Sequence, residues 1–156
     1  EALDGQFELF KVPLEQAKKP EDLNSFSSIF IVGPKTNYTE RELFLLDQYV
    51  MNGGNLVVAA EGIDVDMTQA GGEGTLALPL ENELDRLLFR YGIRINKDVI
   101  QDLNFSLIPV MGGNFGNQDQ FVPLPWPFHF NAGRVQAHPI TKALDQVNFR
   151  FASSLD

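Results

Sequence analysis

Three carboxylates form the closest cluster of chemically active side chains in this sequence. Glu61, Asp64 and Asp66 lie within six residues, directly after an apolar run. Such a set could hold a calcium ion, which takes oxygen ligands, but the D-x-[DN]-x-[DN]-G…E pattern of a calcium loop is absent. We therefore expect a solvated acidic loop, and the sequence predicts no metal site and no cofactor.

The two histidines, His129 and His138, are the candidates for acid–base chemistry. His129 stands between two phenylalanines and His138 precedes a proline, and neither lies in a catalytic motif. The G-x-S-x-G elbow of hydrolases is missing, and the chain has no cysteine, which excludes thiolate nucleophiles, disulfides and iron–sulfur clusters. Structural roles are favoured for both histidines, and no catalytic residue is predicted. A hydrolase or transferase with an unrecognised site remains an alternative.

A turn led by Gly33 continues as Pro34-Lys35-Thr36-Asn37. Neither of the phosphate-binding patterns, G-x-x-x-x-G-K-[ST] or G-x-G-x-x-G, is present. The sequence therefore predicts a tight turn between a strand and a helix, with Lys35 in solvent, and gives no indication of nucleotide binding.

An aromatic segment, Phe121–Phe130 (FVPLPWPFHF), contains the single tryptophan, Trp126. Its rings could form a stacking platform for a sugar or a peptide, because an indole offers a large apolar area at low entropic cost. The competing interpretation is that these rings cover the open edge of a sheet. A carbohydrate- or small-ligand-binding module that uses Trp126 and His129 is therefore an alternative function.

The charge of the chain restricts its partners. Among 156 residues, 12 Lys and Arg face 21 Asp and Glu, which gives a net charge of −9. Such a surface repels nucleic acids and anionic lipids. The longest apolar run, Leu56–Ala60, is far shorter than the roughly 18 residues that span a bilayer. Because the chain begins at Glu1 without a methionine or a signal peptide, we expect it to be a fragment of a longer protein.

The elements that must position these residues alternate between strands and helices. Thr39 and Glu42 form a capping box at the start of a helix, and Asn52-Gly53-Gly54 ends it. The apolar runs on either side are typical of strands buried on both faces, so a βαβ unit is predicted. Helices are expected at Thr39–Met51 and Leu80–Tyr91, and strands at Gln6–Val12, Ile29–Gly33, Asn55–Ala60, Asp98–Gln101 and Val147–Phe151.

The remaining segments are predicted to be irregular. Glu61–Pro79 is interpreted as a long loop. Three prolines in Phe121–Phe130 rule out a central strand throughout, so short irregular strands or an edge extension are expected there. The sequence therefore predicts one α/β domain over residues 1–156, with a mostly parallel sheet flanked by helices and an irregular, aromatic-rich C-terminal part.

From Phe26 to Tyr91, and more loosely from about Gln6 to the end, the chain resembles the GldG-like family of auxiliary components of ABC-type transport systems linked to gliding motility. The resemblance rests on the order of short segments. These are Val32–Thr36, the Thr39-x-x-Glu42-capped helix through Gly54, the strand Asn55–Ala60 with Glu61 after it, Leu87-Leu88, Tyr91–Ile93, Val99–Asp102, His138–Thr141 and Phe149–Leu155. The sequence departs from the family where Glu61-Gly62 replaces an expected Asp-Pro.

This resemblance implies a flavodoxin-like or glutamine-amidotransferase-like fold. It also implies a domain on the extracytoplasmic (periplasmic) face of the bacterial inner membrane, anchored by segments outside this sequence, with an ABC permease and an ATPase as partners. We therefore expect a non-enzymatic auxiliary or binding domain. Because ligands of open α/β sheets bind at the carboxyl ends of the strands, the predicted contact residues are Pro34, Lys35, Thr36, Asn37, Glu61, Asp64 and Asp66, with Trp126 and His129 for the alternative ligand site.

Overall fold

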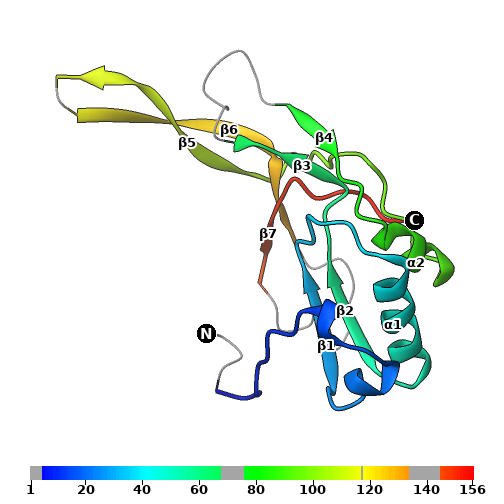
Figure 1. Ribbon diagram of the computed structural model, residues 1–156. Coiled ribbons are helices and arrows are strands. Elements are labelled where there is room, and N and C mark those ends of the chain that lie inside the picture. Colours follow the sequence, from blue (N-terminus) through cyan, green and yellow to red (C-terminus); the bar gives the residue numbers. More distant parts are fainter. Residues whose placement is uncertain (1–4, 68–75, 117, 134–144) are drawn as a thin grey trace. The chain divides into compact units, whose positions relative to one another are not determined.

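The computed structural model describes residues 5–67, 76–116, 118–133 and 145–156, and the uncertain residues are drawn in grey (Figure 1). The chain divides into two compact units. The first unit runs to Ala60 and includes Asn82–Leu87, and the second comprises Glu61–Glu81 and Leu88–Asp156. A single domain over the whole chain stays a prediction. The elements are the 3₁₀ turns η1 (Leu14–Gln16) and η2 (Pro20–Leu23), the helices α1 (Glu40–Met51) and α2 (Leu84–Arg90), and the strands β1 (Ser28–Val32), β2 (Asn55–Ala59), β3 (Ile63–Val65), β4 (Ala77–Pro79), β5 (Phe105–Phe115), β6 (Gln118–Ala132) and β7 (Val147–Arg150).

The first unit contains the predicted βαβ element. β1 pairs with β2 in parallel, from Ser28 opposite Asn55 to Val32 opposite Ala59. The capping box at the start of α1 is confirmed, because Glu42 N–H donates to Thr39 Oγ1 (3.3 Å) and Thr39 N–H donates to Glu42 Oε2 (2.8 Å). These bonds satisfy main-chain donors that a helix start leaves unpaired.

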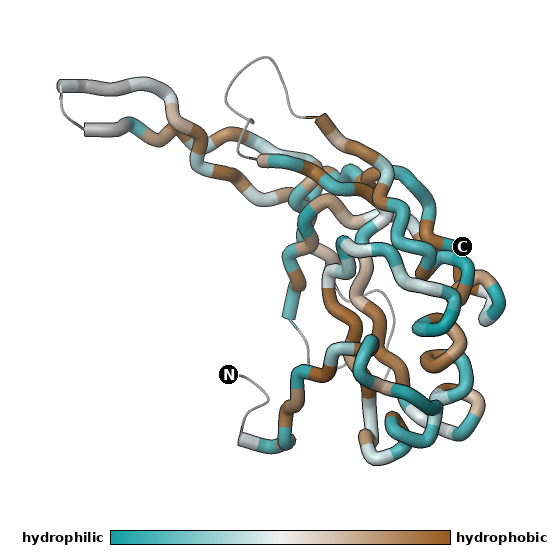
Figure 2. The backbone as a smooth tube through the Cα atoms, viewed as in Figure 1, coloured by the Kyte–Doolittle hydropathy of each residue, from teal (hydrophilic) through white to brown (hydrophobic). Residues whose placement is uncertain are grey.

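The core of the first unit lies between α1 and one face of the β1–β2 pair. Leu45 and Tyr49 of α1 are buried with Ala17 and Leu23, and Ile29 of β1 packs against them. The opposite face is exposed, with Phe30 at 55% and Val32 at 75%, although both strands are strongly hydrophobic (Figure 2). The expectation that these strands are buried on both faces is therefore wrong.

The second unit is antiparallel throughout its described strands. β3 pairs with β4, and β5, β6 and β7 form a sheet in that order. The segment after α2 runs beside the C-terminal residues, where Ile95 and Leu155 form an antiparallel bridge. The expected strand at Val147–Phe151 is present as β7, but its neighbour is the antiparallel β6.

The prediction of a mostly parallel, helix-flanked sheet of flavodoxin-like or glutamine-amidotransferase-like type is wrong. Within the described residues only β1 and β2 are parallel, and the other pairs are antiparallel. Gln6–Val12 alternates in sequence but forms no strand, and neither does Asp98–Gln101. Alternation favours a strand only where a partner strand is available, and tertiary pairing decides the outcome.

The aromatic segment is regular in part and follows one of its two predictions. Phe121–Phe130 lies within the 15-residue strand β6, so the expectation of short irregular strands is wrong, whereas the expected edge extension fits the pairing. Its prolines are accommodated because this part of β6, up to Trp126, pairs only with β5, while β7 begins to pair at His129. A proline without an N–H is tolerated where its backbone faces an open edge.

Candidate functional site

The turn after β1 is held by one buried asparagine. Asn82, 2% exposed, donates from its side-chain amide to the Pro34 carbonyl (2.9 Å), and its own carbonyl accepts from Tyr38 N–H (3.0 Å). Its side-chain oxygen accepts from Leu84 N–H (3.2 Å) at the start of α2. Asn82 thus fixes the loop at both ends and ties it to a helix terminus.

The residues between these two fixed points face solvent. Pro34 is buried, whereas Lys35, Thr36 and Asn37 are exposed. The predicted turn between strand and helix is confirmed, with Gly33 in the left-handed region at φ 55° and its N–H bonded to Ala59 O (2.8 Å). Only glycine adopts this conformation without strain. The loop therefore presents an ammonium, a hydroxyl and an amide from a fixed backbone.

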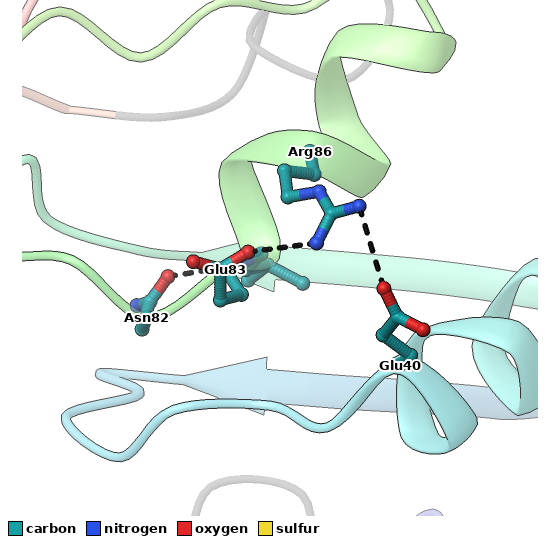
Figure 3. Close-up of polar contacts among 5 residues, drawn as sticks. Glu40, Asn82, Glu83 and Arg86 are labelled. Atoms are coloured by element: carbon teal, nitrogen blue, oxygen red, sulfur yellow. Dashed lines mark hydrogen bonds and ion pairs between the residues drawn. The ribbon is translucent and has the colours of Figure 1, made fainter.

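An arginine on α2 borders the same site. Arg86 contacts Glu83 (Nη1 to Oε2, 3.1 Å) and Glu40 (Nη2 to Oε1, 3.7 Å), as Figure 3 shows. These ion pairs are solvent-exposed and therefore contribute little stability. Glu83 itself has φ 62°, a conformation that costs a non-glycine residue about 1–2 kcal/mol. Backbone strain therefore lies directly next to Asn82, as is common at functional sites.

The acidic residues lie in the second unit. Glu61, Asp64 and Asp66 are all exposed, and Asp64 belongs to β3. Gly62 between them is buried, and its N–H donates to Ser153 Oγ (3.1 Å). The sequence has Glu61-Gly62 where Asp-Pro was expected, and the structure explains the glycine. A Cβ at position 62 would collide with Asn96 O and Ser153 Oγ.

A polar network around Asp98 was not predicted from the sequence. Ser154 donates to Asp98 from both its N–H (2.8 Å) and its hydroxyl (2.6 Å). Asn96 donates to Ser154 Oγ (2.9 Å) and to Asp156 Oδ2 (3.0 Å). The Ser154 hydrogen bonds hold the pKa of Asp98 below its usual value of 3.8. The network fastens the C-terminal residues, and only the adjacent Ser153-Ser154 pair in the sequence hints at it.

Trp126 and His129 lie in an aromatic cluster in the C-terminal half of β6. Trp126 packs edge-on against Phe128 (5.6 Å between centroids), and His129 packs edge-on against Phe151 (4.8 Å). Phe128 and Phe151 stack on each other. His129 is 8% exposed, so it does not point outward, and desolvation together with the charge of Arg150 lowers its pKa. These rings therefore pack against one another within the second unit.

Trp126 Nε1 and His129 Nε2 are both buried without a hydrogen-bond partner among the described residues. Such groups are uncommon in folded proteins. The other histidine, His138, and the segment His138–Thr141 lie outside the described residues.

Neither a metal-binding cluster nor a membrane-spanning helix is found in the described part of the chain. No group of three or more His, Asp or Glu residues there is arranged to hold a metal ion. No helix there is long and apolar enough to cross a bilayer.

Comparisons with known proteins identify the family. A family model described as an ABC-type uncharacterized transport system matches residues 1–156. A search of curated proteins finds no match. A solved structure titled "mmIFT52 N-terminal domain" is similar, with a TM-score of 0.61 and 18% sequence identity over 99% of this chain. The chain spans 61% of that structure's length.

At 18% identity the structural likeness establishes a shared fold and nothing about function. That fold replaces the flavodoxin-like or glutamine-amidotransferase-like fold expected from the sequence. The family match covers every residue of the sequence. The chain belongs to the family of auxiliary components of ABC-type transport systems.

Proposed function

We propose that this chain is a non-enzymatic contact domain that recognises a protein component of its ABC-type transport system through the loop Pro34–Asn37. The observation that carries the proposal is the hold of Asn82 on both ends of that loop. A loop fixed before binding loses little conformational entropy when it meets its partner. Exposed polar side chains on a rigid backbone are therefore suited to recognition.

The chemistry of the loop indicates what it would bind. Lys35 offers only donors, Thr36 a donor and acceptor, and Asn37 both kinds of group. Such a set pairs with the carbonyls and carboxylates of an exposed protein segment. The permease and the ATPase of the same system are the partners that the family suggests.

The other predicted residues supply a separate contact in this proposal. Glu61, Asp64 and Asp66 are exposed carboxylates in the second unit and would meet a basic or polar partner surface. Trp126 and His129 serve the alternative function of small-ligand binding, supported by their unpaired buried nitrogen atoms.

The proposal places the domain on the extracytoplasmic (periplasmic) face of the inner membrane, in a system that can serve gliding motility. Its support is the resemblance to GldG-like proteins. Lys18→Cys, at an exposed position of this cysteine-free sequence, supplies the reporter once any cysteine elsewhere in the full-length protein has been replaced. Labelling by a membrane-impermeant maleimide in intact spheroplasts is expected, and labelling only after lysis would contradict the location.

Co-purification from native membranes tests the function. The full-length protein should bring down the permease and the ATPase, and the triple variant Lys35→Ala, Thr36→Ala, Asn37→Ala should bring down at least tenfold less. The matched control is Lys11→Ala, Gln16→Ala, Asn24→Ala, which changes three exposed residues of the same unit. Equal recovery with both triple variants would contradict the proposed contact.

A further inference from the structure

The β5–β6 ribbon has an uncharged, apolar face that nothing in the chain's described part covers. Between Ser106 and Met111 the register is regular, and three cross-strand pairs line one face: Leu107 with Pro125, Pro109 with Pro123, and Met111 with Phe121. Leu107, Met111 and Phe121 are 59%, 64% and 62% exposed. Hydrophobic residues recur along both strands (Figure 2). A two-stranded ribbon alone is marginally stable in water, which favours a covering partner.

The prolines exclude association through the strand edges. Neither Pro109 nor Pro123 has an N–H, so this pair exchanges no hydrogen bonds and its main-chain groups face the outer edges of the ribbon. Pro125, two residues further along β6, removes the next outward donor. An added strand would find donors missing at these positions, so a partner must meet the face of the ribbon instead.

The distribution of charge indicates which partner fits this face. No Asp, Glu, Lys or Arg occurs from Leu103 to Gly116 or from Gln120 to Gly133, while the whole chain carries −9. Two copies of the chain repel each other elsewhere, but on this face they can meet without bringing like charges together. A basic partner would gain nothing from an uncharged surface.

We propose that the ribbon face formed by Leu107, Pro109, Met111, Phe121, Pro123 and Pro125 is the contact surface of a homodimer. The two ribbons pack face to face in opposite directions, about a two-fold axis that lies across the strands in the plane of the contact. Leu107 of one copy then lies opposite Met111 of the other, and Phe121 lies opposite Pro125.

The size of the face predicts a weak dimer. Three large side chains that are each about 60% exposed, with three prolines, offer roughly 500 Å² per copy, since a large aromatic side chain buries about 150–250 Å². A standard stable interface takes about 800 Å² from each partner. Because standard-size interfaces reach down to μM affinities and this face is smaller, we expect a dissociation constant on the order of 10–100 μM.

Sedimentation velocity of the 156-residue chain from about 5 to 500 μM tests the proposal, with the concentration range set by the expected affinity. The wild type should shift from monomer to dimer over this range. Leu107→Lys and Met111→Glu should each raise the dissociation constant about tenfold or more, equivalent to 1.4 kcal/mol. Leu103→Lys, at a 95% exposed position outside the ribbon, is the matched control and should leave it unchanged.

Mixing the two ribbon variants tests the opposed alignment directly. The introduced ammonium of one copy then faces the introduced carboxylate of the other, so the mixture should associate more strongly than either variant alone. Circular dichroism and unfolding midpoints must show that each variant is folded. A wild type that stays monomeric at 500 μM, a dimer insensitive to both substitutions, or a mixture without recovery would overturn the proposal.

A lipid bilayer is the competing partner for the ribbon face, and a parallel measurement tests it. Flotation of the monomeric wild type with neutral phosphatidylcholine vesicles, abolished by Met111→Glu, would assign the face to a bilayer and overturn the homodimer. Absence of flotation is the expected result.

Discussion

The side-chain amide of Asn82 donates a 2.9 Å hydrogen bond to the main-chain carbonyl of Pro34, 48 positions earlier in the chain. Together with the bonds from Tyr38 N–H and Leu84 N–H, it makes Asn82 the junction of the β1–α1 turn and the start of α2. A buried asparagine in such a position is costly unless its groups are paired, so its contacts determine the shape of the loop.

Replacing this junction should weaken the fold. Asn82→Ala leaves the Leu84 N–H and the Pro34 carbonyl without their partner, and leaving buried groups unpaired costs about 1–3 kcal/mol. We expect a loss of that size in the free energy of unfolding, measured with urea. Asn55→Ala is the matched control, since exposed Asn55 makes one side-chain bond, to Ser27 O, and should cost less than about 1 kcal/mol. Equal losses for both would contradict the role of Asn82.

Gly62 should tolerate no side chain. A Cβ there would meet Asn96 O and, at 2.6 Å, Ser153 Oγ. We expect Gly62→Ala to destabilise the chain by about 1–3 kcal/mol, the usual cost of overpacking. Gly5→Ala is the control, because a Cβ at Gly5 meets nothing within 4 Å. Urea unfolding of both variants checks this, and an unchanged midpoint for Gly62→Ala would show that the close approach is wrong.

Protonation of Asp98 at low pH should lower the stability of the fold, because Asp98 accepts the hydrogen bonds of the C-terminal network. Its pKa is lower in the folded chain than the usual 3.8, first because of the Ser154 hydroxyl. A lowered carboxyl pKa gives stability that is present above about pH 3.8 and is lost as the pH falls through the folded value. Melting temperatures measured from pH 2 to 7 should therefore depend less on pH in Asp98→Asn than in the wild type. An equal pH dependence of the melting temperature in Asp98→Asn and in the wild type would contradict this role of Asp98.

His129 should make the stability of the fold depend on pH in a higher range, below about pH 6.5. Burial, and then the charge of Arg150, lower its pKa below 6.5, so the unfolded chain binds the proton more readily. Stability should fall as the pH drops below about 6.5, until the folded pKa is passed. His129→Phe should remove this slope without a large loss of stability, because it deletes a buried nitrogen that has no partner among the described residues. Proton NMR of the His129 ring gives the pKa, and a midpoint at or above 6.5 would contradict the prediction.

Local signals in the sequence predicted the β1–α1–β2 element well. The Thr39–Glu42 capping box and the glycines after α1 act within a few residues, so the helix start and its end follow from sequence alone. The Pro34–Asn37 turn could be predicted for the same reason.

Pairing between distant segments could not be predicted in this way. Gln6–Val12 has the alternation of a strand but finds no partner, whereas the proline-rich Phe121–Phe130 lies in a long strand because β5 pairs with it. Pro34, which accepts from Asn82, is 48 positions away, and Ser154, which donates to Asp98, is 56 positions away, so both contacts are beyond the reach of any local pattern. Tertiary context decides such contacts.

Binding of the purified chain to the proposed permease–ATPase partner in nanodiscs tests most directly whether a loop held by Asn82 makes the contact. We expect the Lys35, Thr36, Asn37 triple alanine variant and Asn82→Ala both to bind at least tenfold more weakly than the wild type, although Asn82 is buried and cannot touch a partner. The Lys11, Gln16, Asn24 triple alanine variant should bind as the wild type does. Absence of wild-type binding, or equal affinity for all four proteins, would contradict a contact through this loop.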